Sequence, residues 1–288
     1  MTLTLSDHIE TKVTPNSSIY LDGIQTTITR DGSPTLLDFS RDACGTGESM
    51  HSSHGALSES LHVYAPALEL HLPHLNNAAA ACATGVSVCV VGLGLGYLEM
   101  ITAALLLRYV KQPSDPLFKN IHICSFESNT QLVHGIRNWL SGMDSLLHEQ
   151  ICEGVAQAVP EVNTEDIKSL LRELQHAGQW TILGRLDGSF TKQQRTQLGI
   201  AAFDVILYDA YSPASSPELW QSDFLESFLA NHVSHMSNIS HGGTRTAVFA
   251  SYASRTSLKQ SLRKQGFILE KRKGFGSKRE CTLAYRRG

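Results

Sequence analysis

Apolar runs of strand length recur along this chain, and most are followed by a segment with the spacing of an amphipathic helix. The first run, Val86–Val91, precedes residues 97–110, where Leu98, Ile101 and Leu105 share one side of a helix. Similar runs at 121–127, 180–184, 203–208 and 244–251 alternate with predicted helices at 129–140, 145–159, 164–176 and 254–265. This alternation predicts an α/β fold built on a parallel sheet.

Both ends of the chain depart from this alternation. Residues 266–270 and 280–285 are predicted to close the sheet as an antiparallel pair, joined by the segment 271–279. Near the N-terminus, residues 23–30 and 34–39 are predicted as two short strands around the turn 31–33. We therefore divide the chain into a small β-containing N-terminal extension, 1–80, and an α/β domain, 81–288.

Three glycines follow the first predicted strand, where open α/β sheets bind their ligands. Gly92, Gly94 and Gly96 have the spacing G-x-G-x-G, one residue shorter than the G-x-G-x-x-G of dinucleotide sites. Glycine lets the backbone approach a ligand that a Cβ atom would keep away. The shorter spacing suits S-adenosylmethionine (SAM), which has no pyrophosphate. The alternative is a tight turn without a ligand.

Carboxylates stand at or after the ends of three predicted strands. Glu127 ends the second strand, where nucleotide-binding folds hold a ribose diol, although it could instead stabilise the N-terminus of the next helix. Asp187 follows the third strand, where a side chain could contact an adenine edge. Asp209 ends the fourth strand, where a carboxylate near a sulfonium can orient an amine and accept its proton. Its alternative role is to cap the proline-containing turn that follows.

Charge is distributed unevenly along the chain. Residues 255–288 contain 11 Lys and Arg against two acidic residues, whereas the remainder contains 13 basic and 25 acidic residues. A basic end on an acidic body predicts contact with a polyanion, most often nucleic acid. A solvated surface helix and hairpin would show the same composition.

Composition argues against several classes of protein. No segment approaches the roughly 18 consecutive apolar residues of a membrane span, and residues 1–14 lack a signal-peptide pattern. The six cysteines show no C-x-x-C or zinc spacing, which predicts buried reduced thiols such as Cys89 and Cys124 in a cytoplasmic protein. His51, His54 and His62 match no standard ligand spacing, so we predict no metal site.

Three stretches together resemble one known family. Residues 209–220 are similar to its D-G-F-(A/S)-P-x-x-x-P-x-(M/L)-W signature, 271–280 to K-R-K-G-F-G-x-K-R-E, and 51–63 to H-S-x-x-G-A-x-x-E-x-x-H-V. The chain thus resembles MnmC-like methyltransferases, over roughly residues 20–287. In that family the methylating half of a bifunctional enzyme completes 5-methylaminomethyl-2-thiouridine at the tRNA wobble position. The resemblance implies a Rossmann-like SAM-methyltransferase sheet.

The resemblance also implies roles for individual residues. Gly92, Gly94, Gly96, Glu127, Asp187 and Glu59 are expected to bind SAM, and Asp209 is expected to lie between the SAM methyl group and the amine. A substrate surface is expected to contain Tyr211, Lys271, Arg272, Lys273, Phe275, Lys278 and Arg279. Arg185 stands where the family usually has an acid, so an adenine contact is expected from Asp187 or the backbone.

We therefore predict a cytoplasmic SAM-dependent methyltransferase that acts on the 5-aminomethyl nitrogen of a tRNA wobble uridine, without membrane contact. No second glycine-rich strand–turn–helix pattern for FAD occurs in the sequence, so we expect no FAD domain in this chain and an aminomethyl substrate made elsewhere. Two alternatives remain open. One is an enzyme of the same fold that acts on a small amine, and the other is a catalytically inactive RNA-binding protein of that fold.

Overall fold

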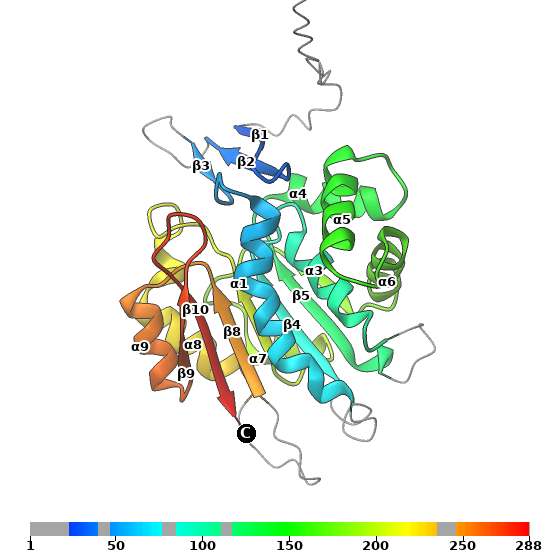
Figure 1. The fold of residues 1–288 in the computed structure, drawn as a ribbon. Coiled ribbons are helices and arrows are strands. Elements are labelled where there is room, and N and C mark those ends of the chain that lie inside the picture. The colour runs from blue at the N-terminus through cyan, green and yellow to red at the C-terminus, as the bar shows by residue number, and fades with distance from the viewer. Residues whose placement is uncertain (1–22, 40–46, 77–84, 111–116, 235–245, 288) are drawn as a thin grey trace, which may run out of the picture.

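A seven-stranded sheet forms the centre of the molecule (Figure 1). The computed structural model describes residues 23–39, 47–76, 85–110, 117–234 and 246–287, so the polar segment 1–14 lies outside the described residues. The strand order is β6-β5-β4-β7-β8-β10-β9. The strands are β4 (Val86–Val91), β5 (Ile121–Phe126), β6 (Trp180–Leu183), β7 (Val205–Tyr208), β8 (Thr246–Ser251), β9 (Ile268–Lys273) and β10 (Glu280–Arg287). The first five are parallel and β10 runs antiparallel to both neighbours, which confirms the predicted fold class.

The burial of the two central strands, β4 and β7, explains why their sequences are mostly apolar. Every residue of β4 and β7 is buried, because helices cover both faces of a parallel sheet. Strands β5 and β6 extend from one side of β4, whereas β7 and β8 extend from the other. The crevice where the strand order reverses lies at the carboxyl ends of β4 and β7, and this is where open α/β sheets bind ligands.

Helices cover the sheet in two layers. One layer contains α1 (Ala56–His71), α3 (Tyr97–Leu106), α4 (Thr130–Leu140), α5 (Leu146–Ala158) and α6 (Thr164–His176). The other contains α7 (Lys192–Gln197), α8 (Ser222–His232) and α9 (Thr256–Lys264). Short 3-10 helices are η1 (Leu72–Asn76), η2 (Phe118–Asn120) and η3 (Pro217–Trp220). None of the helices in the described ranges is long and apolar enough to cross a lipid bilayer.

Helix α1 was not predicted from the sequence, yet it lies across the front of the sheet in Figure 1 and packs on β7, β8 and α3. Its buried residues include Glu59, Val63, Tyr64, Ala67 and Leu68, which have helical spacing. Pro66, a residue that disfavours the interior of a helix, lies among them. Residues 56–71 therefore share the core of the main sheet. The boundary placed at residue 80 stays a prediction.

A small antiparallel sheet holds the start of this helix. Strands β1 (Ile24–Ile28) and β2 (Pro34–Asp38) confirm the predicted N-terminal hairpin, and β3 (Glu48–Ser49), which was not predicted, pairs with β2. Gly55 at the N-cap position of α1 has no side chain, so the hairpin turn supplies acceptors for the unpaired N–H groups of the first turn. Asp31 accepts the Ser58 N–H at 2.9 Å, and Thr29 accepts the Ala56 N–H at 3.1 Å. Hydrogen bonds from Ser33, Ser58 and Thr29 hold the pKa of Asp31 well below its usual range, against the effect of burial.

One predicted boundary was wrong. Residues 271–273 were expected in the connection between the last two strands, but they belong to β9 and pair with β10. Exposed and partly buried positions dominate β9, because it is the edge strand of the sheet and packs on few neighbours. A run of basic residues is compatible with such an edge, where charge opposes pairing with other chains.

Candidate active site

A cavity of about 330 Å³ opens at the carboxyl ends of β4 and β7. This volume is at the lower end of the range for small-molecule sites. Seven of the predicted site residues line the cavity: Glu59, Gly92, Gly94, Glu127, Asp209, Tyr211 and Lys278. The sheet edge thus gathers residues from five distant parts of the sequence into one site.

The glycine turn forms the floor of this cavity. Gly92 has φ +94°, and a Cβ atom there would lie 2.5 Å from the carbonyl oxygen of Asp209. Gly94 has φ +52° and faces more open space, since the nearest atom to a Cβ would be Met50 Sδ at 3.8 Å. Gly96 does not line the cavity and instead begins α3, packed against Ile136. The turn therefore leaves room for a ligand at Gly94 and brings the Asp209 backbone close at Gly92.

Glu127 connects this turn to helix α4. Its Oε2 accepts the Gly94 N–H at 3.0 Å, and its Oε1 accepts the Asn129 N–H at 2.8 Å. Asn129 is the N-cap of α4, so both interpretations of Glu127 are compatible with its position. An acidic acceptor beside an open glycine cradle fits the ribose and methionine parts of SAM. The role of Glu127 as a ribose ligand stays a prediction.

Asp209 lies on the other side of the turn, at the end of β7. The Tyr64 hydroxyl donates to its Oδ1 at 2.6 Å, and the Asp209 N–H donates to Val91 O at 2.8 Å. Burial raises the pKa of Asp209 to about 7, the nearby Glu59 adds to the rise, and the Tyr64 hydrogen bond opposes it. A carboxyl group with this pKa can exchange a proton at neutral pH.

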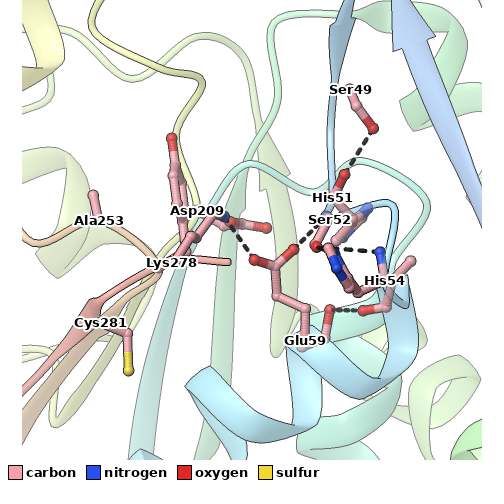
Figure 2. Close-up of polar contacts among 12 residues, drawn as sticks. Ser49, His51, Ser52, His54, Glu59, Asp209, Ala253, Lys278 and Cys281 are labelled. Atoms are coloured by element: carbon pink, nitrogen blue, oxygen red, sulfur yellow. Dashed lines mark hydrogen bonds and ion pairs between the residues drawn. The ribbon is translucent and has the colours of Figure 1, made fainter. Parts of the chain in front are cut away.

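An ion pair closes the cavity beside Asp209. Lys278 Nζ lies 2.6 Å from Glu59 Oε1, and these two side chains point toward one another in Figure 2. The other carboxylate oxygen, Glu59 Oε2, accepts the Ser52 N–H at 2.5 Å. Lys278 also lies over the Tyr252 ring, 4.3 Å from its centroid. The predicted SAM ligand Glu59 is thus buried against a cation, which places a fixed positive charge in the wall of the site.

The segment from β3 to α1 forms a second wall. Glu48 accepts the Ser212 N–H at 2.9 Å and also accepts a hydrogen bond from the Ser215 hydroxyl, so it holds the loop after Asp209. His51 lines the cavity, and burial lowers the pKa of its imidazole to about 4, which leaves it neutral at physiological pH. Groups of three or more potential metal-ligating residues do not occur within the described ranges.

The third-strand acid does not reach the cavity. Asp187 is exposed and accepts the Ser189 N–H at 2.7 Å, which lowers the pKa of its carboxyl group. The cavity wall here contains Arg185 and Leu186 instead. Arg185 Nη2 lies 2.6 Å from Glu218 Oε1, so an ion pair connects the end of β6 with η3. The predicted adenine contact of Asp187 stays a prediction and receives no support from this placement.

The residues of the basic signature lie in four different places. Arg272 donates to His62 O at 3.0 Å, and the Phe275 ring lies 5.9 Å from the His62 ring, so part of the signature packs on α1. Lys271 and Lys273 are exposed on β9. Lys278 lines the cavity, whereas Arg279 lines a neighbouring open basin. The structure therefore brings Lys278 to the candidate catalytic carboxylate and leaves Lys271 and Lys273 outside both hollows.

The basin adjoins the cavity. Both are lined by Ser212, Tyr252 and Lys278. Arg255 and Arg279 line the basin but not the cavity, together with the first residues of α9. A basic surface hollow thus lies next to the cavity that contains Asp209.

Sequence reasoning missed Tyr64, Tyr252 and Arg255. Tyr64 directly follows the stretch 51–63, and it has the i, i+3, i+4 spacing of one helix face with Ser60, Ala67 and Leu68, which is the signal that could have found it. Tyr252 donates to Ala210 O at 3.0 Å, and only the pairing of β8 beside β7 brings it there.

Comparisons with known proteins show which class of proteins this chain resembles. Residues 191–287 match the model of a family described as S-adenosyl-L-methionine-dependent methyltransferase. The resemblance to MnmC-like methyltransferases is confirmed. The match also confirms SAM as the predicted cofactor. It includes β7, the Asp209 loop and the basic signature.

Two curated relatives have the same name, tRNA 5-methylaminomethyl-2-thiouridine biosynthesis bifunctional protein MnmC. The protein of Ralstonia nicotianae is 35% identical over 88 residues, 31% of this chain and 12% of the relative. That of Leptospira borgpetersenii is 39% identical over 77 residues, 27% of this chain and 10% of the relative. The matched segments thus span only about a tenth of the relatives' length.

A solved structure supports the fold over nearly the whole chain. MNMC2 from Aquifex aeolicus superimposes with a TM-score of 0.54 at 23% sequence identity, covering 94% of this chain and 71% of the other. At this identity the likeness shows the fold alone.

Proposed function

We propose that this chain methylates the nitrogen of a 5-aminomethyl group on a tRNA wobble uridine. The observation that supports this proposal best is the position of Asp209. It lines a cavity with the glycine turn, beside a basin lined by Arg255, Lys278 and Arg279. The names of the MnmC relatives, which concern 5-methylaminomethyl-2-thiouridine in tRNA, support this choice of substrate. A phosphate-bearing substrate would meet the basic basin first and the carboxylate last.

SAM supplies an electrophilic methyl group when it is bound. The substrate nitrogen would use its lone pair to form the new N–C bond while the sulfur–methyl bond breaks and its electron pair stays with the departing S-adenosylhomocysteine. Asp209 would accept the proton that this nitrogen loses. Because the pKa of Asp209 is about 7, the carboxylate form is available at neutral and higher pH. Its hydrogen bond with Tyr64 fixes the direction in which the carboxylate faces.

The substrate amine must be neutral when it attacks. An aliphatic amine is normally protonated at pH 7 and then has no lone pair for attack. Glu59 neutralises the charge of Lys278, so this lysine does not by itself deprotonate the amine. We therefore assign removal of the amine proton to the Asp209 carboxylate.

The test is Asp209→Asn, which keeps the size of the side chain and its contact with Tyr64. We expect SAM binding by calorimetry to change less than about threefold and methyl transfer to tRNA bearing aminomethyluridine to fall about 10²-fold or more. Asp223→Asn, an exposed residue of α8, is the matched control. Turnover of Asp209→Asn close to wild type would exclude the assigned role.

Binding and methyl-transfer assays of the wild-type protein separate the alternatives. SAM binding with no methyl transfer to any aminomethyl RNA, in the wild-type protein, would favour the inactive RNA-binding protein. Transfer to small amines that is insensitive to salt would favour the small-amine enzyme, because phosphate contacts weaken steeply with ionic strength. The open, cationic basin favours the RNA substrate over both. A cytoplasmic location remains part of the proposal.

A further inference from the structure

The loop after Asp209, residues 210–216, lies where the cavity and the basin adjoin. Tyr211 and Ser212 line the cavity, and Ser212 and Pro213 line the basin. Ser212 thus belongs to both hollows. The position of this loop therefore determines the shape of the border between them, which a substrate that occupies both hollows must touch.

The first half of the loop is held from the main sheet. The Tyr252 hydroxyl donates to Ala210 O at 3.0 Å, and the Trp220 indole N–H donates to Tyr211 O at 2.7 Å. Tyr252 follows strand β8, and Trp220 ends the helix η3. These two contacts end at residue 211, so they do not hold the part of the loop that lines the basin.

The second half of the loop is held by Glu48. Its Oε1 accepts the Ser212 N–H at 2.9 Å, and its Oε2 accepts a hydrogen bond from the Ser215 hydroxyl. Ser212 and Ser215 form one turn, because the Ser215 N–H donates to Ser212 O at 2.9 Å. A single carboxylate thus connects both ends of this turn to a strand 164 positions earlier in the chain.

Glu48 has a firm support in the small N-terminal sheet. It lies opposite Asp38 in the pairing of β3 with β2. Two residues later, the Met50 N–H donates to Leu36 O at 2.9 Å, and Leu36 is buried in the core that the main sheet shares with α1. The carboxylate of Glu48 therefore has a defined position from which to hold the loop.

We propose that Glu48 is a positioning residue for the RNA substrate, and that it acts by fixing residues 212–215 at the border of the cavity and the basin. This inference rests on the proposed function. It assigns part of the substrate affinity to the N-terminal sheet and leaves the cofactor side of the cavity unaffected. The competing role is direct attraction of the substrate amine by the negative charge of Glu48, which also lines the cavity.

The first test measures the loop itself. Hydrogen exchange of the peptide containing residues 210–216 should become about tenfold faster in Glu48→Ala, because the Ser212 N–H loses its acceptor. Glu48→Gln should exchange nearly as wild type, since an amide can accept from Ser212 and donate to the Ser215 hydroxyl. The matched control is Glu153→Ala, an exposed residue of α5 that lines neither hollow.

The second test measures binding of an RNA stem-loop that contains one 5-aminomethyluridine. We expect Glu48→Ala to weaken this binding about tenfold, because the loop loses two hydrogen bonds to a charged group. Glu48→Gln should weaken it less than about threefold, because both hydrogen bonds can be replaced. Calorimetry with S-adenosylhomocysteine should show the same affinity in all variants, which a general loss of folded structure would not.

A double-mutant cycle identifies the route of the effect. Ser215→Ala removes one of the two hydrogen bonds and should weaken RNA binding about threefold. Combined with Glu48→Ala it should cause no further loss, since the partner of Ser215 is already absent. Losses that multiply would overturn the proposal. Equal losses in Glu48→Gln and Glu48→Ala would also overturn it and would assign the effect to the charge of Glu48.

The outcomes distinguish this inference from the proposed function. Failure of the wild-type protein to bind or methylate the RNA would exclude the proposed function, and with it any effect of Glu48 on that substrate. Normal RNA binding and methylation by the wild-type protein, together with unchanged exchange and affinity in Glu48→Ala, would overturn this inference alone.

Discussion

The hydroxyl of Tyr64 lies 2.6 Å from Asp209 Oδ1 and joins helix α1 to the end of strand β7. Tyr64 is 1% exposed, and the Tyr252 N–H donates to the same hydroxyl at 3.4 Å. The carboxylate at the centre of the proposed chemistry is therefore oriented by a residue 145 positions earlier in the chain. This contact makes helix α1, in the N-terminal part of the protein, a component of the candidate active site.

The wild-type enzyme should lose activity as the pH falls below about 7. Burial raises the pKa of Asp209 to about 7, and only the carboxylate form can accept the amine proton. We expect kcat/KM to fall about tenfold per pH unit on the acidic side. A pH profile measured with saturating SAM tests this, and a profile that is flat between pH 5 and 8 would contradict it.

Tyr64→Phe should move this profile toward higher pH. The phenol stabilises the charged carboxylate, so its removal should raise the apparent pKa by about one unit. Activity would then be about fivefold lower at pH 7 and nearly restored at pH 9. Tyr109→Phe, outside the cavity, is the control. A loss of equal size at every pH would mean that Tyr64 does not tune the carboxylate.

Gly92→Ala should destabilise the protein and weaken SAM binding. Its Cβ atom would lie 2.5 Å from Asp209 O, so the loop carrying the carboxylate must move. Gly142→Ala is an informative control, because Gly142 has φ +95° but a Cβ there meets no atom within 4 Å. We expect a loss of about 1 kcal/mol for Gly142→Ala from backbone strain, and clearly more for Gly92→Ala. Equal melting temperatures for the two variants would refute the close approach.

Arg255→Ala combined with Arg279→Ala should weaken RNA binding. Both side chains line the basin, and neither is paired with Glu59, so the cavity wall stays intact. The slope of log K against log salt should become shallower by about one to two units. Lys192→Ala with Arg137→Ala removes the same charge from surfaces outside the basin and should leave the slope nearly unchanged. The basin is excluded from the RNA interface if the two double variants behave alike.

Glu99→Gln should stabilise the protein at alkaline pH. Ser125 donates to Glu99 Oε1 at 2.6 Å, and Oε2 is buried without a hydrogen-bond partner among the described residues. Burial raises the pKa of Glu99 to about 8, above the value of 4.5 for an unperturbed glutamate. The folded state therefore binds a proton that the unfolded chain has lost, and stability falls as the pH rises from 4.5 through 8.

Glutamine cannot ionise, so its advantage over Glu99 should grow by roughly 2 kcal/mol between pH 6 and 8. Urea unfolding of both proteins at these two pH values measures this difference. A difference in stability that does not change with pH would show that Glu99 is already ionised in the folded state.

Much of the sheet could be predicted from the sequence, because the patterns that indicate its strands lie within short segments of the chain. The central strands are apolar runs, and the glycines and Asp209 come directly at strand ends, so their meeting in one crevice follows from the order of the elements. The closing hairpin was also predicted, although the extent of β9 was not. Because β9 is exposed at the edge of the sheet, its residues show no regular alternation of buried and exposed positions that would mark where the strand ends.

The remaining site residues depend on packing between distant segments. Helix α1 brings Glu59 to the cavity and Tyr64 to Asp209, and the spacing of residues 56–71 does not indicate which strands these side chains meet. The pairing of Arg185 with Glu218 joins two loops from different strands. Such contacts arise from the three-dimensional arrangement of the sheet, not from spacing along the chain.

Glu59 and Lys278 are 219 positions apart along the chain, and both belong to the cavity. Lys278 lies in the turn between β9 and β10, so the ion pair forms only when this hairpin lies against helix α1. Loss of the hairpin would leave the buried Glu59 carboxylate without its counter-charge. The wall of the candidate site therefore depends on segments from both ends of the described chain.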